Sequence, residues 1–207
     1  MLAGETETCM VEKNFEKLGP SLIPNEITSG KFKATLYGFE NGERYFALEF
    51  GKLSEERPLV RLASACLLAH VFSSQRCDCV FQLREAMGFL HERGGLLVYG
   101  VDDHANGAGL EASMKTYALA DNGMDPYTAL QHLGFEADQR EYAATAAILR
   151  DYRIEKVRLV TNNPRKLREL VKHGIDCERV ALKQSPMNEH NRLSLQGKKK
   201  LGHLVEL

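Results

Sequence analysis

Two neighbouring stretches of alternating apolar and polar residues limit the folds open to this 207-residue chain. They cover residues 31–39 and 44–50, and Glu40-Asn41-Gly42 between them is typical of a hairpin turn. A third short apolar stretch follows at 59–62. The first third of the chain therefore predicts a sheet that includes a hairpin.

Helical and strand patterns alternate in the rest of the chain. The apolar spacing predicts helices at 81–91, after the glycines of 107–109, at 143–152 and at 164–173, and strands at 96–99 and 157–160. Pro164 suits a first helical turn and Gly174 a C-terminal cap. Strands followed by alternating helices and strands predict one α+β (mixed α/β) domain, with a mixed β-sheet flanked by helices.

Composition agrees with a folded chain, since 43% of the residues are hydrophobic and 27% are charged. The longest clean apolar run, 96–99, is far too short to cross a membrane. Residues 1–22 hold several glutamates and predict a loose leader rather than a signal peptide. Residues 183–207 predict a polar tail, which leaves 23–182 as the main domain. We expect a cytoplasmic protein.

The charge pattern favours a small anionic ligand. The net charge is −1, whereas a protein that binds a nucleic acid polymer usually has a basic excess. The segment from Arg153 to Lys172 nevertheless holds seven Lys or Arg against two Glu, a local charge of +5. Such a basic segment on a near-neutral chain suits a small anion.

Three of the five cysteines, Cys66, Cys77 and Cys79, are spaced C-x10-C-x-C. An odd cysteine count argues against a disulfide framework. Thiolates bind zinc, and three protein ligands leave a fourth position open, as in catalytic zinc sites. The alternative is three buried thiols without a metal. The polar segment Arg76-Cys77-Asp78-Cys79 is a poor core strand and favours zinc.

Three further polar segments are candidate sites. In 161–166, backbone N–H groups at a helix start, with Thr161 and Lys166, would attract phosphate, or form an ordinary helix cap. Asp138 and Arg140 are either an acid–base pair or a surface ion pair. Residues 102–109 lie between a strand and a helix, where active-site loops occur, and His104 there is a ligand, a base or neither.

Taken in chain order, these segments resemble GTP cyclohydrolase II, the zinc enzyme that opens the guanine ring at the start of riboflavin synthesis. The resemblance runs from about Ile23 to Leu204. Its most specific parts are Cys66 with 71–79, then 115–119 and 134–142, while 161–166 and 200–204 also match.

The resemblance implies a role for each matching position. Cys66, Cys77 and Cys79 correspond to the zinc ligands, Asp138 to the proton acceptor, Arg140 to the nucleophile toward the phosphate chain, and Tyr117 to an active-site tyrosine. Arg61, Thr161 and Lys166 correspond to residues that hold the nucleotide, chiefly its phosphates, and Gln82 to a substrate contact. The family also implies Zn²⁺, Mg²⁺ with the nucleotide phosphates, and a homodimer.

The loop at 102–109 departs from the family pattern. The family has Arg-Gln-Glu-Gly-Arg there, and its Glu and second Arg contact the nucleotide; this chain has His104 and Asn106 at those two positions and Asp102 at the first. The Asp that follows the first zinc cysteine in the family is His70 here, and a substrate-contacting Thr is Pro126. His104 and Asn106 are therefore candidate substrate contacts of an altered pocket.

These departures leave two hypotheses. In the first, the chain is a hydrolase that acts on C–N bonds in the ring of a nucleotide. Its substrate is not GTP but, for example, a pyrimidine nucleotide or a modified purine, or it converts GTP to a different product. Alternatively it binds a nucleotide and has lost catalysis. The retained cysteines with Asp138, Arg140 and Tyr117 favour the hydrolase. A third class, a zinc module that binds RNA, fits the lysines at 198–200 but not the net charge.

Overall fold

The computed structural model describes residues 14–53 and 56–206. Their strands form one sheet in the order β1-β2-β3-β5-β4-β6-β7. β1 (Phe15–Pro24), β2 (Lys31–Phe39), β3 (Arg44–Phe50) and β5 (Gly95–Gly100) pair antiparallel in that order. β4 (Leu59–Ser64), β6 (Lys156–Val160) and β7 (Asp176–Val180) continue it in parallel from β5. The predicted mixed sheet is confirmed.

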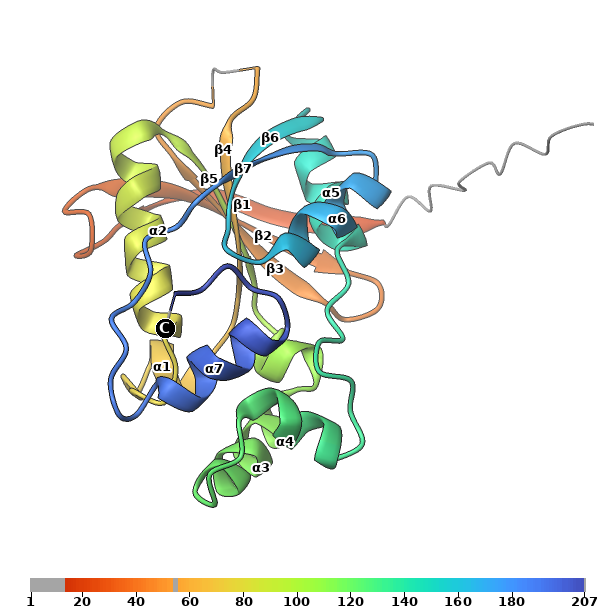
Figure 1. Cartoon of the computed structure of the whole chain (residues 1–207). Helices are drawn as coiled ribbons and strands as arrows, with labels where there is room; N and C mark the ends of the chain where they lie inside the picture. The colour runs from red at the N-terminus through yellow and green to blue at the C-terminus, as the bar shows by residue number, and fades with distance from the viewer. Residues whose placement is uncertain (1–13, 54–55, 207) are drawn as a thin grey trace, which may run out of the picture.

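Helices lie on both faces of the sheet and beyond one end of it (Figure 1). α2 (Cys79–Arg93) covers one face, and α5 (Ala143–Asp151) and α6 (Pro164–Lys172) cover the other. The remaining helices lie beyond the end of the sheet where β4 and β5 finish: α1 (Leu67–His70), α3 (Leu110–Ala120), α4 (Pro126–His132) and α7 (Arg192–Lys200). None of the described helices combines the length and hydropathy needed to span a bilayer.

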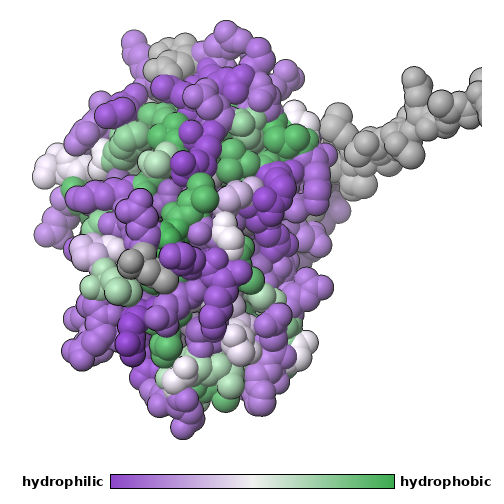
Figure 2. Space-filling view, in the orientation of Figure 1, coloured by the Kyte–Doolittle hydropathy of each residue, from purple (hydrophilic) through white to green (hydrophobic). Residues whose placement is uncertain are grey.

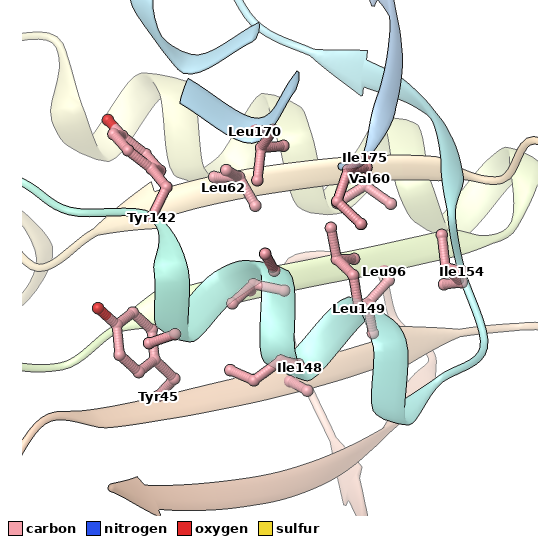
Figure 3. Packing of buried hydrophobic residues seen from close by; sticks show 14 of the residues in the cluster. Tyr45, Val60, Leu62, Leu96, Tyr142, Ile148, Leu149, Ile154, Leu170 and Ile175 are labelled. Atoms are coloured by element: carbon pink, nitrogen blue, oxygen red, sulfur yellow. The ribbon is translucent and has the colours of Figure 1, made fainter. Parts of the chain in front are cut away.

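The two faces of the sheet bury separate clusters because successive side chains of a strand point to opposite sides. Leu96 packs with Ile148 and Leu149 of α5 (Figure 3), while Leu97 packs against Met87 and Leu90 of α2. Each fully buried Leu or Ile contributes about 1.5–3 kcal/mol to the free energy of unfolding. On the outside, Figure 2 shows hydrophilic residues over much of the visible face, with groups of hydrophobic ones between them.

Both ends of the chain differ from the sequence prediction. Residues 15–22 belong to β1 and pair with β2, although we predicted a loose leader for 1–22; residues 1–13 lie outside the described part. The predicted polar tail contains α7, which buries Leu195, Gly197 and Lys198. Backbone hydrogen bonds to β2 hold β1 in place, and the buried face of α7 holds the C-terminal segment in place.

The order of the parallel strands predicts a crevice at the carboxyl ends of β4 and β6. These strands are neighbours, and the helices that follow them, α2 and α6, lie on opposite faces of the sheet. Ligands of such sheets bind outside the carboxyl ends of the strands at a point of this kind.

Candidate active site

A cavity of about 450 Å³ lies beyond the carboxyl ends of β4 and β6. It brings together ten of the twelve residues predicted for the site: Arg61, Cys66, Cys77, Cys79, Gln82, Asn106, Tyr117, Arg140, Thr161 and Lys166. Asp138 lies behind Arg140, and His104 is not among the described residues that line the cavity. Segments far apart in the chain thus form one concave surface.

The three thiols meet at the junction of α1 and α2. Cys66 follows β4, while Cys77 and Cys79 flank the start of α2. Their sulfur atoms all lie within 4.8 Å of one another, and the sulfurs of Cys66 and Cys77 are 3.8 Å apart. Two thiolates on one tetrahedral zinc, each about 2.3 Å from the ion, are separated by about 3.8 Å. The described residues therefore fit a zinc ion.

His70 fixes the position of this thiol cluster. Its Nδ1 accepts from the backbone N–H of Cys66 at 3.3 Å and lies 2.9 Å from the hydroxyl of Tyr99. Its Nε2 lies 3.3 Å from the carbonyl oxygen of Cys79. Burial lowers the pKa of His70, which favours the neutral ring. A neutral ring that donates from Nε2 and accepts at Nδ1 satisfies all of these contacts.

Arg140 and Asp138 form a buried, bidentate ion pair. Arg140 donates to the Asp138 carboxylate from Nε at 2.8 Å and from Nη2 at 2.7 Å. Burial opposes ionisation of Asp138, but the hydrogen bonds and charges of Arg140 and Arg165 hold its pKa below the usual range. The Nη1 of Arg140 donates to Ser64 at 3.2 Å. Asp138 therefore orients a guanidinium on the cavity wall.

The segment 161–166 joins β6 to α6 beside the cavity. The Asn163 side chain caps α6 by accepting from the N–H of Arg165 at 2.9 Å, and Thr161 Oγ1 accepts from the N–H of Asn163 at 3.0 Å. Lys166 Nζ donates to the carbonyl of Leu62 at 2.8 Å. Burial, together with the charges of Arg140 and Arg61, holds the pKa of Lys166 well below its usual range. An anion at this place would restore the charged form of Lys166.

Two buried donors on the same wall, Nε of Arg61 and Nδ2 of Asn163, have no hydrogen-bond partner within residues 14–53 and 56–206. A buried unpaired donor costs about 1–3 kcal/mol, so native structures seldom leave one without a reason. Both residues line the cavity. A bound anion would supply the missing acceptors.

A hydrogen-bonded chain that the sequence did not predict crosses the floor of the site. Arg61 donates to Gln82 at 2.8 Å, and Gln82 donates to Asp78 at 2.6 Å. Asp78 lies between two of the thiols and also accepts from Lys198 of α7. The position of Asp78 between two cysteines could have marked it as a site residue. Nothing in the sequence links it to Lys198, which lies 120 residues away.

The loop 102–109 turns only some of its polar side chains toward the cavity. Asp102 forms an ion pair with Arg44 at 2.7 Å and does not line the cavity. Asp103 does line it, accepts from Ser64 at 3.2 Å, and has its pKa raised by burial. Asn106 also lines it, with its amide donating to the carbonyl of Ala137 at 3.2 Å. Of the two aspartates in this loop, only Asp103 therefore faces the cavity.

Residues 23–181 match the family model described as GTP cyclohydrolase II. The chain belongs to the GTP cyclohydrolase II family. The predicted resemblance is confirmed, and the family match covers every residue of the cavity wall discussed above except those of the C-terminal segment.

Relatives of this family come from several bacteria. GTP cyclohydrolase-2 of Vibrio cholerae is 36% identical over 166 residues, 79% of this chain and 83% of the relative. GTP cyclohydrolase-2 of Pseudomonas aeruginosa is 40% identical over 178 residues, 83% of this chain and 86% of the relative. Riboflavin biosynthesis protein RibBA of Aquifex aeolicus is 42% identical over 194 residues, 91% of this chain. The match spans 47% of that longer relative.

Proposed function

We propose that this protein is a zinc-dependent hydrolase that opens the heterocyclic ring of a nucleotide. The main support is that three thiols, the guanidinium of Arg140 held by Asp138, and the cations Arg61 and Lys166 meet at one cavity. Two buried donors on its wall, on Arg61 and Asn163, lack a partner among the described residues. A zinc ion held by three thiolates supplies a Lewis acid with an open coordination position. The alternative, a homologue that binds without catalysis, has no physical need for this full set of groups.

The residues of the chain divide the work on the substrate. Arg61, Thr161 and Lys166 bind the phosphates, and Arg140 faces the phosphate chain with its guanidinium held by Asp138. We assign Asp138 the proton-acceptor role that the family resemblance implies, and its lowered pKa keeps it an ionised carboxylate at neutral pH. Tyr117 lies on the wall near the thiols, and burial raises its pKa to about 12, so its hydroxyl remains a hydrogen-bond donor at neutral pH.

We further propose that GTP is not the preferred substrate. A carboxylate can accept from two N–H groups of guanine, and at its family position this chain has His104, which does not line the cavity. A neutral amide, Asn106, stands where the family has an arginine. The proposal rests on these two substitutions relative to the family. Asp102 adds no support, because its charge is balanced by the ion pair with Arg44. Mg²⁺ on the phosphates and a homodimer remain predictions from the family, and a cytoplasmic location remains a prediction from the composition.

The first experiment measures zinc. Elemental analysis should find about one zinc per chain, because the thiols form a single set of ligands. Cys77→Ser and Cys79→Ser should each abolish it, whereas Cys177→Ser, in β7, should not. Full zinc occupancy in both of the first two variants would contradict the metal assignment.

The second experiment measures substrate choice. Zinc-loaded protein is incubated with GTP and with other purine and pyrimidine nucleotides, and products are identified by mass spectrometry. We expect a ring-opened product, with a nucleotide other than GTP giving the highest kcat/KM. The double variant His104→Glu/Asn106→Arg should raise kcat/KM for GTP. No ring opening of any nucleotide would refute the hydrolase, and GTP outperforming every competitor would refute the altered preference alone.

A further inference from the structure

The C-terminal segment brings His203 to the wall of the cavity. The backbone N–H of His203 donates to the carbonyl of Lys198 at 3.0 Å, and the N–H of Leu204 donates to the carbonyl of Asn162 at 2.8 Å. The ring of His203 packs edge-on against Tyr127 of α4, with ring centroids 6.4 Å apart. His203 is therefore held between α7, α4 and the turn that precedes α6, which is the phosphate-facing wall.

The ring nitrogens of His203 have no hydrogen-bond partner among the described residues, although the residue lies half-buried at the cavity. The charges of Lys198, Arg140 and Lys166 lower the pKa of His203, and the carboxylate of Asp138 raises it. Burial and the three cations lower the pKa of His203 to about 4. At neutral pH the ring is therefore uncharged and offers one N–H donor and one acceptor.

We propose that His203 contacts the substrate and donates a hydrogen bond to its phosphate chain. The cations around the ring attract an anion, and a free N–H at the cavity adds a donor to the bound anion. The neutral ring contributes this donor without adding to the repulsion among the cations. The inference rests on the proposed function in one respect, namely that a nucleotide phosphate enters this cavity.

Lys198 is the positioning residue for His203. Its ammonium group forms a buried ion pair with Asp78, while its backbone carbonyl accepts from His203. The ion pair fixes the last turn of α7 against the start of α2. Loss of this ion pair should therefore weaken the contact of His203 with phosphate, even though the hydrogen bond from the N–H of His203 to the carbonyl of residue 198 can still form.

The experiment measures binding of inorganic tripolyphosphate and of guanosine to the zinc-loaded protein by calorimetry. His203→Leu should weaken tripolyphosphate binding roughly tenfold or more, as expected for the loss of a hydrogen bond to a charged group, and leave guanosine binding unchanged. His203→Gln retains a donor and should recover part of the loss. His132→Leu, at the exposed end of α4, is the matched control. Tripolyphosphate binding within about twofold of wild type in His203→Leu would overturn the proposal.

A second measurement needs no variant of His203. The imidazole ¹⁵N signals of His203 should shift when tripolyphosphate is added to the wild-type protein, and those of His132 should not. Unchanged His203 signals at saturation would overturn the inference. Ring opening is assayed in parallel: a protein that binds tripolyphosphate through His203 but opens no nucleotide ring would refute the proposed function and leave this inference standing.

Discussion

Replacing Lys198 by Met tests whether the buried ion pair with Asp78 holds the C-terminal segment in place. The side chains of Asp78 and Lys198 are 3% and 11% exposed, so neither charge can turn to solvent. Lys198→Met keeps most of the aliphatic length of the side chain but leaves Asp78 without its cation. Removing one partner of a buried ion pair costs about 3–5 kcal/mol in the free energy of unfolding.

The contacts around Asp78 place the expected loss near the lower end of that range. Gln82 still donates to the second oxygen of Asp78 at 2.6 Å, so the carboxylate keeps one hydrogen bond. The matched control is Lys200→Met. Lys200 lies two residues after Lys198 in α7 and forms an ion pair with Asp125, which caps α4. Lys200 is 70% exposed whereas Asp125 is 6% exposed, but Asp125 keeps its hydrogen bonds from Tyr127 and Thr128 without Lys200, so we expect a loss of about 0–1 kcal/mol.

Urea denaturation at a fixed zinc concentration measures both losses, and a double-mutant cycle separates the pair from its surroundings. Asp78→Asn/Lys198→Met removes both charges and should recover much of the stability lost in Lys198→Met. A loss in Lys198→Met no larger than that in Lys200→Met would refute the reasoning. So would a double variant that shows the sum of the two single losses, since the two residues would then act independently.

The remaining predictions concern the phosphate wall, the thiol cluster and the response to acid. Lys166→Ala should weaken nucleotide binding by about 1–3 kcal/mol and nucleoside binding little, with the exposed Lys172→Ala as control; equal losses for both ligands would show that Lys166 does not meet phosphate. His70→Leu should lower zinc affinity about 10- to 100-fold in a chelator competition, because His70 orients the backbone at Cys66 and Cys79; unchanged affinity would contradict that role. The lowered pKa of Asp138 means that its contribution to stability is present above its unfolded pKa of about 4 and is lost as pH falls through the folded value. Asp138→Asn should therefore lose less stability than wild type on acidification below about pH 4, and identical acid profiles would refute this assignment.

The core strands were predictable because one face of each is buried and the other is not. Residues 31–39 and 44–50 match β2 and β3 end to end, since alternation along each stretch reports the inward face. β1 gave no such signal, because nine of its ten residues are exposed and backbone pairing alone orders them. α7 was missed for a related reason, since its last three residues are lysines and one of them is buried.

The candidate site was predictable where chemistry depends on residue type and short spacing, as for the three cysteines. It was not predictable where partners are distant in the chain. Asp78 and Lys198 are 120 residues apart, and the ring of His203 reaches the cavity through a helix that we had predicted as tail. His104 shows the opposite case, since its neighbours Ala105 and Asn106 turn in the left-handed region with φ values of 48° and 55° and leave His104 off the cavity wall.

The hydrogen-bonded chain from Arg61 through Gln82 and Asp78 to Lys198 links the phosphate wall, the thiol cluster and the C-terminal segment. A substitution in that chain should therefore disturb metal binding and phosphate binding together. His104 and Asn106 lie outside it, and the Asn106 side chain bonds instead to the carbonyl of Ala137. We therefore expect His104→Glu/Asn106→Arg to change which nucleotide is preferred while zinc content and stability stay near those of the unaltered protein.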